Sequence, residues 1–72
     1  MLYEIEHDGY IVVVSPNPKY ALEKLFNDTM VLFDIDDKLP KLQKMNVGET
    51  FVLASGTYVT TYERDMMGGK LV

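Results

Sequence analysis

The sequence predicts an α+β domain in which strands and helices follow one another in the order ββααββ. Two stretches rich in β-branched and aromatic residues lie toward the two ends of the chain, and each is divided by a short turn signal. Between them lies an amphipathic segment that opens with helix-start signals. We therefore expect one antiparallel sheet made of two terminal hairpins, with two short helices packed on one face. The sheet has four strands, or five if residues 30–35 add one.

The C-terminal hairpin, residues 48–64, holds the longest run of strand-forming residues, and Ser55 and Gly56 supply its turn. Regular alternation from a two-residue loop predicts two faces. The face with the large side chains consists of Phe51, Leu53, Tyr58, Thr60 and Tyr62. The face with the small side chains consists of Thr50, Val52, Ala54, Thr57, Val59 and Thr61. Neither face is polar enough for water alone, so either both are covered or one is open to a partner.

The N-terminal hairpin joins residues 2–6 to residues 10–15 through Asp8 and Gly9, the strongest short hairpin signal in the chain. Regular pairing from this turn places Ile5 opposite Val12. The predicted core face then consists of Tyr3, Ile5, His7, Tyr10, Val12 and Val14. The opposite face consists of Glu4, Glu6, Ile11 and Val13. Because charge discourages edge pairing, we expect the first strand at the edge of the sheet and the second at its centre.

The first helix begins at a strong signal, because Asn17 is a good N-cap and Pro18 suits the first helical position. Its apolar stripe consists of Leu22, Leu25, Phe26 and Thr29. We expect the helix to end near residue 27 or 28, because Asn, Asp and Thr are poor interior helix residues. Residues 30–35 could continue the helix or form a buried strand, and we favour an extended segment.

A short second helix is predicted from about Pro40 to Met45, because the proline restricts Leu39 before it. Leu42 and Met45 should face inward with Leu39 beside them. Lysines at threefold spacing give this helix a basic side, which consists of Lys38, Lys41 and Lys44.

Length and composition predict a single domain over residues 1–64, followed by a flexible tail over residues 65–72 that contains paired glycines. The 11 acidic residues against 7 basic ones give a net charge of −4. An acidic balance argues against binding to a phosphate backbone. The chain has no cysteine, no signal-peptide pattern and no apolar run near the ~20 residues of a membrane span. We expect a cytoplasmic protein with no membrane partner.

The sequence carries no pattern for catalysis, for a metal or for a cofactor, so we expect a protein that is not an enzyme. His7 lies between Glu6 and Asp8, but it is the only histidine and has no cysteine to complete a metal site. Three aspartates lie close together in a pattern that only superficially resembles a calcium loop: Asp34, Asp36 and Asp37. We interpret His7 as a residue beside a turn and the aspartates as caps of a helix N-terminus.

The function that we favour is a non-enzymatic protein–protein interaction module, such as a small regulator or inhibitor of a larger protein, of the size and character of many phage-encoded proteins. Tyrosine, methionine and arginine are enriched at interface cores, and the last strand and the tail offer five of them. The predicted partner-binding residues are Tyr58, Tyr62, Arg64, Met66, Met67, Glu4, Glu6, Asp34, Asp36 and Asp37. The carboxylates, together with Asp8, would engage a basic surface of the target.

Two alternative functions remain open on the same residues. The chain could bind a single-stranded nucleic acid, with its bases stacked on Tyr58 and Tyr62 and its backbone contacted by Arg64. The net charge makes this partner the less favoured one. The chain could instead be a structural subunit that assembles with itself, with a homodimer as the simplest form.

Overall fold

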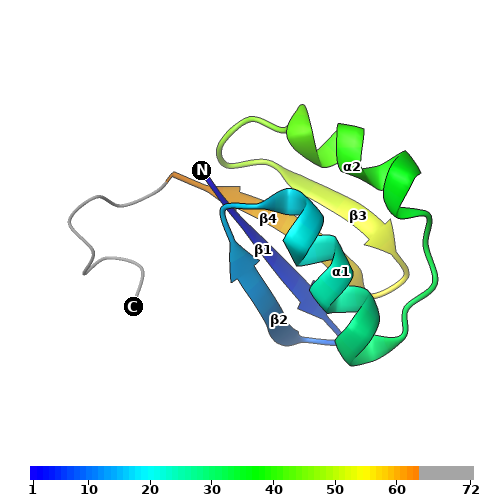
Figure 1. Ribbon diagram of the computed structural model, residues 1–72. Helices are drawn as coiled ribbons and strands as arrows, with labels where there is room; N and C mark the ends of the chain where they lie inside the picture. The colour runs from blue at the N-terminus through cyan, green and yellow to red at the C-terminus, as the bar shows by residue number, and fades with distance from the viewer. Residues whose placement is uncertain (64–72) are drawn as a thin grey trace.

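The computed structural model describes residues 1–63, which form one four-stranded antiparallel sheet and two helices. The elements are β1 (Leu2–His7), β2 (Tyr10–Ser15), α1 (Pro18–Thr29), α2 (Ile35–Gln43), β3 (Thr50–Ala54) and β4 (Thr57–Tyr62). Both helices lie on the same face of the sheet (Figure 1). The predicted α+β class and the ββααββ order are confirmed. Residues 30–34 form neither helix nor strand, so the sheet of the described chain has four strands.

The strands lie in the order β2-β1-β4-β3, with the first and last strands side by side at the centre. The prediction that β1 is an edge strand and β2 a central one is therefore wrong. β1 pairs with β4 along its whole length, from Leu2 opposite Tyr62 to His7 opposite Thr57. The charges of Glu4 and Glu6, interpreted as protection of an edge, instead point out from the middle of the sheet, on the side away from the helices.

Both predicted turns are present, and the two turns touch each other. Asp8 and Gly9 have φ values of 52° and 86°, the pair of positive values that a two-residue hairpin loop of type I′ requires. The Asp8 N–H donates to the carbonyl of Gly56 in the other turn, at 3.0 Å. The φ of 77° at Gly56 favours glycine, and a Cβ there would also lie 2.9 Å from the Asp8 carboxylate, which would have to shift.

A bulge in β2 changes the predicted register of the first hairpin. His7 lies opposite Tyr10 as expected, but Ile5 lies opposite Val13 because Val12 is an extra residue in the strand. Val13 is consequently buried, and Val14, predicted to face the core, is exposed. Tyr10, also predicted in the core, is 77% exposed because it lies at the turn.

A second bulge, in β3, mixes the two faces that regular alternation predicts for the C-terminal hairpin. Ala54 lies opposite Thr57 as expected, but Val52 lies opposite Tyr58 because Leu53 is the extra residue. The side facing the helices takes residues from both predicted faces: Phe51, Leu53, Thr57, Val59 and Thr61. The other side also takes residues from both: Thr50, Val52, Tyr58, Thr60 and Tyr62.

Helix α1 begins as predicted, because the Asn17 side chain accepts hydrogen bonds from the N–H groups of Lys19 and Tyr20 at 3.0 and 3.1 Å. Pro18 is its first residue. It extends through Thr29, one residue beyond the expected end, and Met30 closes it in a left-handed conformation with φ of 60°.

Helix α2 spans Ile35–Gln43, so the predicted start at Pro40 is wrong. The true N-cap is Asp34, whose side chain accepts from the Asp36 N–H at 2.9 Å. Pro40 lies inside the helix, where its ring is exposed and only one intrahelical hydrogen bond is lost. Packing of Leu42 and Met45 against the core outweighs that loss, and their predicted inward orientation is confirmed.

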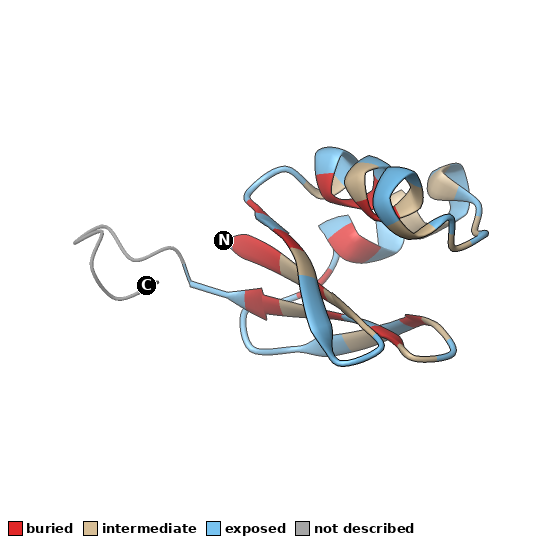
Figure 2. Cartoon of the chain, turned by 90° about the horizontal axis from the view of Figure 1, so that it is seen from below, coloured by how far each residue is buried: buried red, intermediate tan, exposed pale blue. Residues whose placement is uncertain are grey.

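The core lies between the helices and the sheet (Figure 2). Its fully buried members are Ile5, Ala21, Leu22, Leu25, Leu42 and Val59. α1 contacts β1 and β2, while α2 leads into β3, the strand at the opposite edge of the sheet from β2 (Figure 1). Within residues 1–63, neither helix has the length and apolar character needed to cross a membrane.

Candidate functional site

The candidate site is the face of the sheet opposite the helices, called here the open face. Strand register assigns ten side chains to it, of which Leu2 is buried: Leu2, Glu4, Glu6, Ile11, Val14, Thr50, Val52, Tyr58, Thr60 and Tyr62. Two rows cross all four strands. One row runs Ile11, Glu6, Tyr58, Val52, and the other runs Val14, Glu4, Thr60, Thr50. Each row therefore has a carboxylate on the central strand β1 and a β-branched side chain at either edge.

The carboxylates of the open face lie beside the tyrosines of β4. Tyr62 donates a hydrogen bond from its hydroxyl to Glu4 Oε2 at 3.4 Å, and Tyr58 is the direct cross-strand neighbour of Glu6. The negative charge of Glu4, followed by partial burial of the ring and by that hydrogen bond, raises the pKa of Tyr62. Tyr62 is therefore held as a neutral hydrogen-bond donor beside a negative charge.

The open face exposes apolar side chains on its two edge strands and an aromatic ring on the central strand β4. Ile11 is 62% exposed, Val52 57% and Tyr58 41%. A sheet face in water normally carries polar residues, so this much exposed aliphatic and aromatic surface is typical of a face that contacts another molecule. Every lysine within residues 1–63 lies in a helix or at the cap of α2, so the open face carries no lysine.

The structure brings together four of the ten predicted partner-binding residues and separates three others. Tyr58, Tyr62, Glu4 and Glu6 share the open face. The three predicted aspartates lie in the helical layer at the start of α2, where one caps the helix and two occupy its first turn: Asp34, Asp36 and Asp37. The remaining three, Arg64, Met66 and Met67, lie outside the described residues, as does the predicted tail.

His7 lies at the end of β1 beside the turn, as its sequence position indicates. Its Nδ1 is 2.7 Å from the hydroxyl of Thr57, and its Nε2 is 3.3 Å from a carboxylate oxygen of Asp8. Both ring nitrogens thus have a partner within the two hairpins. Within the described chain, no group of three or more His, Cys, Asp or Glu side chains has the geometry to hold a metal ion.

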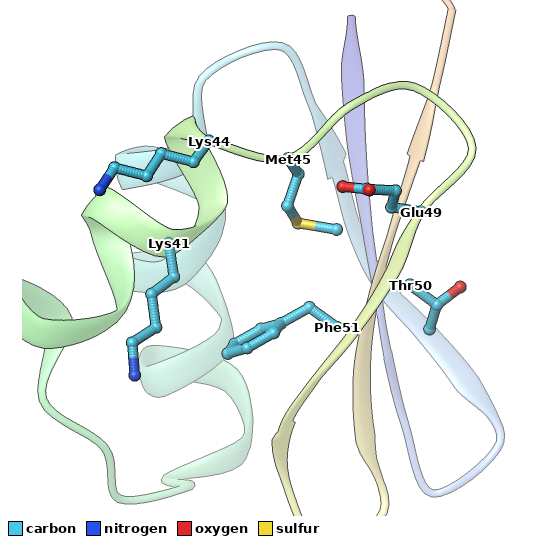
Figure 3. A pocket seen from close by; sticks show the side chains of 6 residues that line it. All are labelled: Lys41, Lys44, Met45, Glu49, Thr50 and Phe51. Carbon is cyan, nitrogen blue, oxygen red and sulfur yellow. The ribbon is translucent and has the colours of Figure 1, made fainter.

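A separate open groove of about 400 Å³ lies between α2 and β3. Its lining comprises Lys41, Lys44, Met45, Glu49, Thr50 and Phe51. Figure 3 shows the Phe51 ring pointing from the strand toward the helix that carries Lys41. Lys38 on the same helix lies 5.9 Å from the centre of that ring. The predicted basic side of α2 therefore borders this groove.

Sequence reasoning missed the apolar residues of the open face because it assumed regular strands. Ile11 was placed opposite the core face, as observed, whereas Val14 was assigned to the core face and Val52 to the face opposite Tyr58 and Tyr62. One signal was available, since four consecutive β-branched residues, 11–14, cannot all follow a clean inside–outside alternation. The bulge in β3 has no comparable signal.

Comparison with protein-family models, with curated proteins and with solved structures gave no match for this chain. The fold and the site together define a small α+β domain whose sheet has one face packed under two helices and one face open.

Proposed function

We propose that the protein is a non-enzymatic interaction module that binds a protein partner through the open face. The observation that carries the proposal is the composition of that face, where exposed aliphatic side chains and two tyrosines surround a pair of carboxylates. Aromatic side chains supply large contact area with little loss of conformational freedom, and they are enriched at binding hot spots.

The partner in this proposal has a basic patch with an apolar border. Glu4 and Glu6 are half-buried on the central strand, and neither has a lysine beside it on the open face. An arginine or lysine of the partner would pair with them, while the apolar edges of the face would contact aliphatic side chains around it. Binding a basic, functional surface of a larger protein would make this chain a regulator or inhibitor. A cytoplasmic location belongs to the same proposal and is supported by a sequence without cysteine.

Affinity capture from a lysate of the source organism, with matched variants, tests the proposal. The intact protein should retain a partner that Tyr58→Ala and the double variant Glu4→Gln/Glu6→Gln lose, because the first removes the central aromatic contact and the second removes both charges. Tyr20→Ala is the control, since Tyr20 is an exposed tyrosine on α1. A partner retained equally by all the variants would contradict the proposal.

Two companion measurements test the two alternative functions, nucleic-acid binding and self-assembly. Labelled single-stranded DNA or RNA should show no binding at low ionic strength, because carboxylates beside Tyr58 and Tyr62 repel phosphates. Salt-sensitive binding to either one would show that the partner is a nucleic acid and not a protein. Light scattering on a sizing column should give a monomer at high concentration, and a dimer lost on Tyr58→Ala would assign the open face to a second copy.

A further inference from the structure

We infer a second binding site, in which an extended acidic peptide segment of a partner adds to the free edge of β3 and lies in the groove beside α2. The inference rests on two features that lie side by side: an unpaired strand edge and a groove bordered by lysines.

The edge of β3 offers backbone hydrogen-bonding groups to an added strand. The N–H of Thr61 donates to the carbonyl of Glu49 at 3.0 Å, and Phe51 lies directly opposite Val59. Bonded and non-bonded positions alternate along an antiparallel pair. The backbone groups of Thr50 and Val52 therefore point away from β4, toward an edge that pairs with no other strand of the described chain.

The groove supplies side-chain recognition on the helix side of that edge. Phe51 and Met45 give it an apolar floor, and Lys41 and Lys44 give it positive charge (Figure 3). A strand added to β3 would point alternate side chains into this groove, because the faces of adjacent strands are continuous across a sheet.

The charge around the groove favours an acidic occupant. Lys44 makes no ion pair within residues 1–63, and Lys41 has only a long one of 3.7 Å to Asp37. The one carboxylate of the lining, that of Glu49, already accepts a hydrogen bond from the N–H of Asn46 at 2.8 Å. In a protein of net charge −4, this groove is thus a local positive site, opposite in sign to the open face.

A labelled peptide of about eight residues in which glutamate and valine alternate is a direct probe, because it is long enough for one strand. Fluorescence anisotropy should show binding of this peptide and no binding of its lysine–valine counterpart. The double variant Lys41→Glu/Lys44→Glu should weaken binding at least about tenfold, since it places like charges against the peptide. Both lysines are exposed, so circular dichroism should show an unchanged fold.

The double variant Lys19→Glu/Lys24→Glu is the matched control, because it makes the same change in net charge on α1. It should leave binding unchanged. Equal losses in the two double variants would show a general charge effect and overturn the site, and so would equal binding of the acidic and basic peptides.

N-methylation of the peptide tests strand addition without altering the protein. In an added strand, alternate N–H groups face β3 and the others face water. Methylating one set, all valines or all glutamates, should abolish binding, while methylating the other set should leave it within about twofold. Equal effects of the two sets would overturn strand addition. A dimer in sedimentation that excludes the peptide would assign the edge to a second copy and would also overturn the proposal.

Discussion

The two faces of the sheet are built from alternating residues of the same four strands, yet they differ in almost every physical respect. On the covered face, Ile5 and Val59 are fully buried and meet the side chains of α1 and α2. On the open face, their sequence neighbours Glu4 and Glu6 on β1 and Tyr58 on β4 carry charge and aromatic surface toward water. The comparison shows that neighbouring residues of one strand can serve two different surfaces, one buried under the helices and one exposed to water.

The difference predicts that substitutions on the two faces separate stability from binding. A fully buried aliphatic side chain loses its transfer free energy and leaves a cavity when it is truncated. An exposed one loses little, because water already contacts it in the folded protein. Equal losses of stability from truncations on the two faces would contradict this separation.

The largest expected effect is that of Ile5→Ala, which should lower the free energy of unfolding by about 2–5 kcal/mol. Ile5 is fully buried between Val13 and Val59 on the neighbouring strands. Urea denaturation followed by circular dichroism measures the change. Ile11→Ala on the open face is the control and should change stability by no more than about 0.5 kcal/mol. Similar losses in the two variants would mean that the open face is covered in solution.

Deleting one of the three consecutive valines, 12–14, should remove the bulge of β2 and keep both faces as they are. The shortened strand would pair regularly, with one valine opposite Ile5 and Ser15 still opposite Tyr3. The loss of one half-buried valine should cost about 1–2 kcal/mol. Cross-strand NOEs between backbone protons report the register. A register in which Ser15 turns to the open face would contradict the role assigned to the bulge.

Replacing the central charge of a row should convert the open face into a self-associating surface. Glu6→Val makes the row from Ile11 to Val52 apolar without interruption, which should leave the fold intact and promote association between copies. Sedimentation velocity at increasing concentration measures it. Glu6→Gln keeps a polar side chain and should stay monomeric. If Glu6→Val stayed monomeric as well, the charge would have no protective role.

The smallest expected effect is on the titration of Tyr62, whose pKa is raised above the ordinary tyrosine value of 10.0 chiefly by the charge of Glu4. Because the pKa of Tyr62 is higher in the folded protein than in the unfolded chain, it contributes stability at pH values below the unfolded pKa, and this contribution is lost as pH rises through the folded pKa. Glu4→Gln removes the charge that raises the pKa of Tyr62 and should lower it. Carbon-13 NMR of the labelled tyrosine ring follows it. Glu63→Gln should leave it unchanged, and a response to Glu63 instead would contradict the observed contact.

The element order, both turns and the start of α1 could be predicted from the sequence because local chemistry fixes them. Asp8 and Gly9 adopt the positive φ values of a tight hairpin. Asn17 and Pro18 start a helix through local hydrogen bonds and backbone geometry, without help from tertiary contacts. The predicted start of α2 is wrong because a proline usually ends or opens a helix. Here the Asp34 cap and the buried Leu42 stabilise a helix that contains Pro40.

The composition of the open face could be predicted only in part, because a single extra residue reverses the alternation of everything beyond it. Glu4, Glu6 and Tyr58, predicted as partner-binding residues, lie on one face of the sheet because β1 and β4 pair in regular register. Val14 and Val52 were misplaced, since β2 and β3 are bulged. The predicted strand order is wrong for a different reason, because the pairing of β1 with β4 joins the two ends of the chain and leaves no local signal in the sequence.

Photo-crosslinking from defined positions in cells tests whether the open face binds a basic protein partner. A benzoylphenylalanine at Tyr58 on the open face is compared with one at Tyr20 on α1, where the exposed fractions of the native tyrosines are 41% and 50%. We expect Tyr58→benzoylphenylalanine to crosslink to a protein with a basic surface and Tyr20→benzoylphenylalanine to give no such crosslink. Crosslinks from position 20 alone, or nucleic acid captured from position 58, would contradict it.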